Sequence, residues 1–181
     1  MLRRRSKHIS ALAFNDIGAV VSAEGLRRIL GYVGIGSAFF ESRDAAMSYL
    51  KSVLAPFHII TSEEHWRHMF EVSFTPLPGG RYALAYDPGI NQPFRDAVSQ
   101  TEGIADVDLT RFWKAVACPV LLLRGERSDI LPRAVAQAMC DRPQPVKLVE
   151  IMDTGHAPAL LQESQIRIVA DWALQRACPV P

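Results

Sequence analysis

The sequence has few cysteines, almost no net charge and no long apolar run, and each absence narrows the classes of protein that it can encode. Three cysteines in 181 residues show neither a disulfide framework nor metal-ligand spacing, which suits a reducing compartment. A net charge of +1 gives no field strong enough to gather nucleic acid. No apolar stretch approaches the length of a membrane-spanning helix. We therefore expect a cytoplasmic protein with no nucleic-acid or membrane partner.

Signals for cofactors are missing as well. The sequence contains no Gly-rich phosphate loop and no metal-ligand cluster, so we expect no cofactor and no metal. What is present is an ordinary globular composition, with 49% hydrophobic residues. A chain of this length is expected to form one domain with a real core.

The most informative stretch runs from Cys118 to Pro132. Residues 120–124 form an apolar run between Pro119 and Gly125, and this pattern predicts a buried strand. A polar turn that contains Asp129 follows. Pro132 then predicts the start of a helix, because its fixed φ suits the first helical turn.

Residues 146–151, Val-Lys-Leu-Val-Glu-Ile, predict a second strand, which ends just before Asp153-Thr-Gly-His156. A strand, helix, strand sequence of this kind forms a parallel unit whose crossover returns to the same edge of the sheet. Asp129 and His156 then follow neighbouring strands and could meet across about 4.8 Å. A carboxylate in that position can orient an imidazole that serves as a general base.

Leu-Leu-Leu-Arg-Gly-Glu-Arg-Ser-Asp-Ile-Leu-Pro (121–132) followed by Asp-Thr-Gly-His-Ala-Pro (153–158) resembles the carboxyl-terminal part of an α/β-hydrolase. The resemblance extends upstream through Phe-Asn-Asp-Ile-Gly (14–18) and an intervening region similar to the family's lid. In that family the serine nucleophile, the acid and the histidine follow one another along the chain. The resemblance implies a hydrolase of ester, lactone or related bonds by a Ser-His-Asp mechanism, with His156 as base and Asp129 as acid.

Both assignments have alternatives. Asp16 is an alternative acid, because it also follows a predicted strand and some family members carry their acid after the equivalent strand. A role in turning the Asn-Asp-Ile-Gly segment is the plainer explanation for Asp16. Asp129 could equally be a turn residue bonded to its own backbone, and His156 could be a loop histidine with local partners.

The sequence supplies no nucleophile, because Gly-x-Ser-x-Gly occurs nowhere in it. Around Ser37 the glycines are displaced and no predicted strand precedes them, so the pattern does not predict the strained elbow of the family. Ser128 shares the turn of Asp129, and Cys118 begins a strand. A histidine and an acid without a nucleophile and an oxyanion hole are not a competent hydrolase.

The fold class that we predict is α/β, a partial α/β-hydrolase fold with about three core parallel strands plus an inserted, mainly helical lid. The strands are expected at 9–14, 120–124 and 146–151. The predicted divisions are a core strand with its exit turn (1–18), the lid (19–117) and the carboxyl-terminal core segment (118–181). So few strands cannot bury a parallel sheet. The simplest account is a truncated chain that is inactive alone.

Helices are predicted at 23–33 and 43–54 within the lid and at 162–177 in the tail. A further helix in the lid is expected to begin at Thr61, because Thr61 and Glu64 have the form of a capping box. Four lid aromatics would suit an apolar, ester-like small-molecule substrate, although they could equally form the lid's own core. They are Phe39, Phe40, Trp66 and Phe70.

An unpaired sheet edge and exposed apolar surface would predict an oligomer or a partner chain that covers them. From this, a second hypothesis follows. The protein could be a non-catalytic binding or regulatory protein that retains the lid and pairs with another chain.

Overall fold

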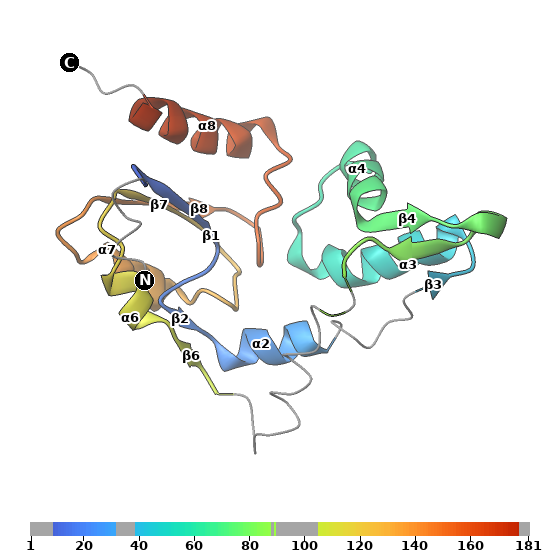
Figure 1. Cartoon of the computed structure of the whole chain (residues 1–181), viewed down its shortest axis with the longest axis horizontal. Coiled ribbons are helices and arrows are strands. Elements are labelled where there is room, and N and C mark those ends of the chain that lie inside the picture. The colour runs from blue at the N-terminus through green and yellow to red at the C-terminus, as the bar shows by residue number, and fades with distance from the viewer. Residues whose placement is uncertain (1–8, 32–38, 88, 90–104, 178–181) are drawn as a thin grey trace. The chain divides into compact units, whose positions relative to one another are not determined.

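The computed structural model describes residues 9–31, 39–87, 89 and 105–177 (Figure 1). The chain divides into two compact units. The first consists of Met1–Ala23 and Asp106–Pro181, and the second is Glu24–Ala105. Residues 19–23 and 106–117, which the sequence analysis assigned to the lid, therefore fold with the first unit.

A three-stranded parallel sheet forms the centre of the first unit. Its strands are β1 (Leu12–Asn15), β7 (Val120–Gly125) and β8 (Val146–Ile151), in the order β1-β7-β8. All three predicted strands are confirmed, as is the α/β class. Every residue of β7 is buried, as expected for a central strand covered on both faces.

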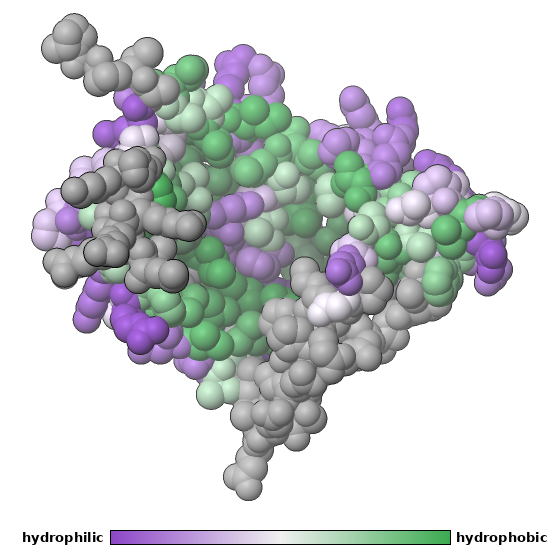
Figure 2. Space-filling view, viewed as in Figure 1, coloured by the Kyte–Doolittle hydropathy of each residue, from purple (hydrophilic) through white to green (hydrophobic). Residues whose placement is uncertain are grey.

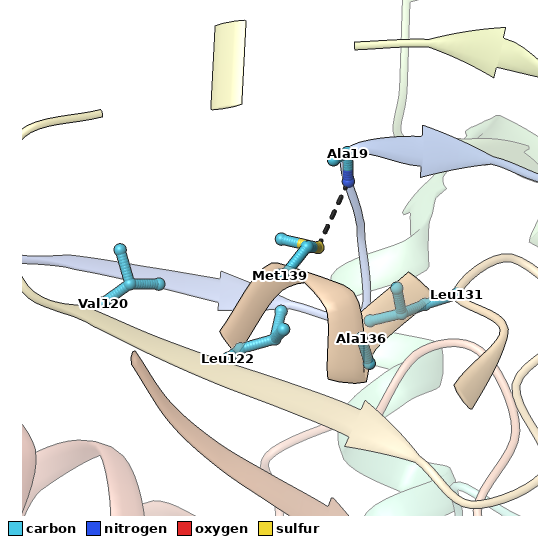
Figure 3. Packing of buried hydrophobic residues seen from close by; sticks show 6 residues of the cluster. All are labelled: Ala19, Val120, Leu122, Leu131, Ala136 and Met139. Atoms are coloured by element: carbon cyan, nitrogen blue, oxygen red, sulfur yellow. Dashed lines mark hydrogen bonds between the residues drawn. The ribbon is translucent and has the colours of Figure 1, made fainter. Parts of the chain in front are cut away.

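Helices cover both faces of this sheet (Figure 1). Because side chains alternate along a strand, Val120 and Leu122 point to the face covered by α7 (Arg133–Cys140) and α6 (Thr110–Lys114). Leu121 and Leu123 point to the other face and pack against Trp172 of α8 (Glu163–Ala177). Figure 3 shows core residues of the α7 face, and its dashed line marks the hydrogen bond from the Ala19 N–H to the Met139 sulfur, which is 3.2 Å long.

The chain passes from one unit to the other twice, and a small antiparallel ladder pairs the first-unit segments next to these two connections. It pairs β2 (Val20–Val21) with β6 (Val107–Asp108). The Asp108 carboxylate accepts a 2.8 Å hydrogen bond from the Thr110 N–H at the start of α6. Hydrogen bonding by Thr110 holds the pKa of the Asp108 carboxyl below its usual value.

The second unit combines helices with a small sheet. Its helical segments are α2 (Ala23–Leu30, which begins at the boundary), α3 (Arg43–Leu54), η2 (Ala55–Phe57), α4 (Glu63–Ser73) and η3 (Pro78–Gly80). An antiparallel sheet, β3-β5-β4, is built from Phe39–Phe40, Tyr82–Leu84 and Phe74–Pro76. The helices predicted at 43–54 and after Thr61 are present, and the one predicted at 23–33 is present to Leu30, with residues 32–33 outside the described part. The small sheet makes this unit mixed rather than mainly helical.

The predicted capping box at Thr61 was wrong by one residue. Ser62 has the extended backbone of an N-cap, and its hydroxyl accepts a 3.1 Å hydrogen bond from the His65 N–H. In the part of the chain that the structure describes, no helix is both long and apolar enough to cross a bilayer.

Candidate catalytic site

Two turns and one loop lie together at the carboxyl ends of the three parallel strands. Asp16 follows β1 directly, and Asp129 lies in the turn between β7 and α7. The third segment, residues 152–160 after β8, is called the histidine loop here because it carries His156. Because the strands are parallel, all three segments leave the sheet at the same end, the carboxyl ends of the strands.

The imidazole of His156 is hydrogen bonded to Asp16. Its Nδ1 lies 3.0 Å from Oδ2 of Asp16 and 3.1 Å from the backbone oxygen of the same residue. A carbonyl oxygen and a carboxylate only accept hydrogen bonds, so Nδ1 must carry the proton. In the neutral ring Nε2 then holds the lone pair. The arrangement leaves an oriented imidazole whose second nitrogen can take a proton from a substrate or nucleophile.

The Asp16 carboxylate is fixed by more than the histidine. Asp16 is fully buried, and its Oδ1 accepts a 3.0 Å hydrogen bond from the Gly125 N–H. Its own N–H donates to the Leu123 oxygen at 2.9 Å. The backbone at Asp16 is left-handed, with φ 57°, a conformation that Asp tolerates better than most residues. Each carboxylate oxygen therefore has a defined partner.

Asp129 was the preferred acid in the sequence analysis, but the structure brings the alternative acid, Asp16, to Nδ1 of His156. The expectation assumed that the histidine would stop above the neighbouring strand, β7. The histidine loop instead crosses the end of β7 and reaches the exit of β1, two strands away. Asp129 is half-buried within its turn.

Two residues that the sequence analysis did not select hold the loop in this position. The Asn15 side chain donates to the Pro158 oxygen at 2.9 Å, which ties the far end of the loop to β1. Gly125 lies directly under the carbonyls of Thr154 and Gly155. A glycine directly after the predicted strand at 120–124 was the available signal, but only the folded chain shows which segment passes over it.

None of the described serine and cysteine candidates is placed to act as the nucleophile beside His156. The buried Ser128 uses its hydroxyl to accept the Leu131 N–H at 3.1 Å, as a turn residue does. Cys118 precedes β7 and so lies at the opposite end of the sheet from His156. Burial raises the pKa of the Cys140 thiol, which favours the unreactive protonated form. Ser37 lies outside the described residues.

Three of the four predicted substrate-lining aromatics pack into the second unit's own core. Phe70 is buried there, and Phe40 and Trp66 pack against it with partial exposure. Phe39 is 56% exposed on β3. Over the described segments, no group of three or more His, Cys, Asp or Glu side chains could hold a metal ion.

Three known proteins to which the chain is similar are named as hydrolases. No protein-family model matches the chain. It is 31% identical over 167 residues to a 3-hydroxybutyrate-oligomer hydrolase from Cupriavidus necator. It is also similar to the crystal structure of an alpha/beta hydrolase from Novosphingobium aromaticivorans, with 34% identity and a TM-score of 0.78. The crystal structure of a candidate hydrolase from Rickettsia typhi matches with 29% identity and a TM-score of 0.79.

These matches include almost all of the chain but little more than half of each relative. The three alignments cover 91%, 97% and 96% of the chain, in the order given. They cover 56%, 61% and 58% of the corresponding proteins.

Proposed function

The chain belongs to the α/β-hydrolase fold family, and on this basis we propose that it supplies the general base and the orienting acid of a hydrolase of ester, lactone or related bonds. In this proposal His156 is the base and Asp16 is the acid. The observation that carries the proposal is the hydrogen bond from His156 Nδ1 to the buried Asp16 carboxylate, 3.0 Å long.

The proposed chemistry starts at Nε2 of His156. Nε2 takes the proton from a serine hydroxyl while the serine oxygen attacks the acyl carbon, and it then passes that proton to the departing alcohol. Water repeats the cycle on the acyl-enzyme. The buried Asp16 carboxylate keeps the ring in the correct tautomer and stabilises the imidazolium that forms in each half-reaction.

The serine is assigned to polypeptide other than these 181 residues. The absence of Gly-x-Ser-x-Gly from the sequence supports this assignment, as does the match to little more than half of each relative. A strand placed parallel to β1 on its open side would end beside Asp16 and His156, about 4.8 Å from the end of β1. By this account the 181 residues alone are inactive.

An apolar, ester-like small molecule is the proposed substrate class. The Cupriavidus necator relative is named for the hydrolysis of 3-hydroxybutyrate oligomers, whose repeating units are joined by ester bonds. That name supports ester chemistry for this chain without fixing the acyl group.

Hydrolysis of p-nitrophenyl butyrate tests the proposal. The 181-residue chain is compared with a longer form in which the upstream coding sequence is restored. We expect activity in the longer form alone. His156→Gln in that form should reduce kcat by at least about 10⁴-fold. His68→Gln, an exposed histidine on α4, is the matched control and should retain activity. Inactivity of both lengths, or full activity of His156→Gln, would contradict the proposal.

A second candidate function is a non-catalytic protein that pairs with another chain. Two observations favour it. On the side of β1 away from β7, no described strand pairs with it. An apolar groove of about 260 Å³ also runs beside β1 and α6. Light scattering during size-exclusion chromatography tests pairing, and a well-folded monomer that binds nothing would argue against it.

A further inference from the structure

We propose that Gly125 is a positioning residue for the Asp16–His156 pair, because its missing side chain leaves the passage through which the histidine loop crosses β7. The catalytic meaning of this inference rests on the proposed function. The geometric claim stands separately, since it concerns only where the loop lies.

The space above Gly125 is closed by main-chain atoms. A Cβ built on Gly125 would lie 2.4 Å from the Gly155 oxygen and 2.5 Å from the Thr154 oxygen. Contacts this short are far inside the van der Waals separation. Main-chain carbonyls cannot rotate away as the end of a side chain can. Among the residues that the structure describes, Gly125 is not one with positive φ, so space and not backbone conformation excludes a side chain there.

The histidine loop has little freedom to move, because hydrogen bonds hold it near its start, at Asp153 and Thr154, and at its end, at Leu160. The Thr154 oxygen accepts the Arg127 N–H at 2.9 Å, and the Asp153 N–H donates to the Glu126 carboxylate at 2.9 Å. Further along, the buried Gln165 side chain accepts the Leu160 N–H at 3.1 Å. A methyl group at position 125 would therefore have to lift the segment that precedes His156.

Gly125 also contacts the other member of the pair. Its N–H donates to Oδ1 of Asp16 at 3.0 Å, while Oδ2 of the same carboxylate faces His156. A single residue thus fixes the acid from below and leaves room for the histidine loop above. Displacing either contact would separate Nδ1 of His156 from the carboxylate.

The test is proton NMR of the 181-residue chain carrying Gly125→Ala. The hydrogen-bonded Nδ1 proton of His156 is identified as the downfield signal that His156→Gln removes. We expect Gly125→Ala to lose this signal while circular dichroism shows a folded protein. Retention of the signal in a folded Gly125→Ala protein would overturn the proposal.

Gly18→Ala is the matched control. It lies just beyond Asp16, and its Cβ would meet the end of the Leu131 side chain at 2.5 Å, which can move. This variant should lose stability but keep the Nδ1 signal. Loss of the signal in Gly18→Ala would mean that general loosening of the first unit is enough, and the proposal would fail.

If Gly125→Ala does not fold, Asn15→Ala decides the question, because it frees the loop from β1 without adding bulk. In this proposal the histidine loop covers Gly125, so freeing the loop should expose both hydrogen bonds to the Asp16 carboxylate. We expect the Gly125 amide proton and the His156 Nδ1 proton both to exchange with solvent faster in Asn15→Ala. Faster exchange of the histidine proton with an unchanged Gly125 amide would overturn the proposal. Neither readout depends on ester hydrolysis, so failure of the proposed function would be seen separately.

Discussion

At the scale of single residues, two aspartates follow strands that end on the same side of the sheet, and their surroundings differ. Asp16 is fully buried with both carboxylate oxygens hydrogen bonded, whereas Asp129 is half-buried in its turn. A buried carboxylate is costly unless its partners are fixed. The complete set of partners around Asp16 is what an orienting acid requires.

If the proposed function holds, Asp16→Asn should reduce kcat of the longer form by about 10³–10⁴-fold, because the amide would favour the wrong tautomer of His156. Asp129→Asn should reduce it far less. The measurement is hydrolysis of p-nitrophenyl butyrate by both variants, with unfolding curves to check stability. A larger loss of kcat in Asp129→Asn than in Asp16→Asn would identify Asp129 as the orienting acid.

The sequence alone indicated His156, Asp129 and Asp16 as candidates, but it paired His156 with Asp129, whereas the structure places His156 against Asp16. His156 was identified because a histidine after a terminal strand has a recognisable context. The partner was misassigned because that choice depends on how far the histidine loop travels. Its path is set by the space above Gly125 and the tie from Asn15, which are tertiary features without a local sequence pattern.

At the scale of elements, a buried arginine organises the turn between β7 and α7. Arg124 is 5% exposed and donates to the Leu131 oxygen at 2.8 Å and to the Glu126 oxygen at 3.0 Å. Its guanidinium also pairs with Glu150 on β8 at 2.7 Å. The side chain therefore closes both ends of the turn and joins two strands. Hydropathy alone predicted this strand correctly, but it could not show why a charge is buried at its end.

Removing this arginine should be strongly destabilising. We expect Arg124→Ala to lower the free energy of unfolding by about 3 kcal/mol, since it leaves the buried Leu131 carbonyl without its donor and removes the closer of two arginines from Glu150. The figure is at the low end for a buried pair because Glu150 is partly exposed and also contacts Arg133.

The control for this prediction is Arg167→Ala. Arg167 forms an exposed pair with Glu163 one turn away on α8, and such pairs contribute less than about 0.5 kcal/mol. Urea unfolding of both variants measures the difference. Equal losses in the two variants would show that the Arg124 network does not hold the turn.

At the scale of the whole molecule, β1 is an edge strand of the sheet as far as the described residues show. Leu12 donates its N–H to the oxygen of Pro119, just before β7, and Asp16 donates to Leu123 within β7. The alternating groups of Ala13 and Asn15 therefore face the other side. No described strand lies there. Figure 2 shows apolar surface in the region of β1 and β2 on the face in view, and Ile17 and Phe112 beside the groove are 40% and 46% exposed. An open edge next to apolar surface favours association with another chain.

This face should therefore control the association of the 181-residue chain. We expect the chain to self-associate as its concentration rises, and Phe112→Lys to reduce this, because an ammonium in the groove would lose hydration when the face is covered. Leu174→Lys, at a residue 65% exposed on α8, is the control and should change association little. Light scattering across a concentration series measures both variants. If the unsubstituted chain stays monomeric, or if Leu174→Lys has the larger effect, the association surface is not the β1 side of the sheet.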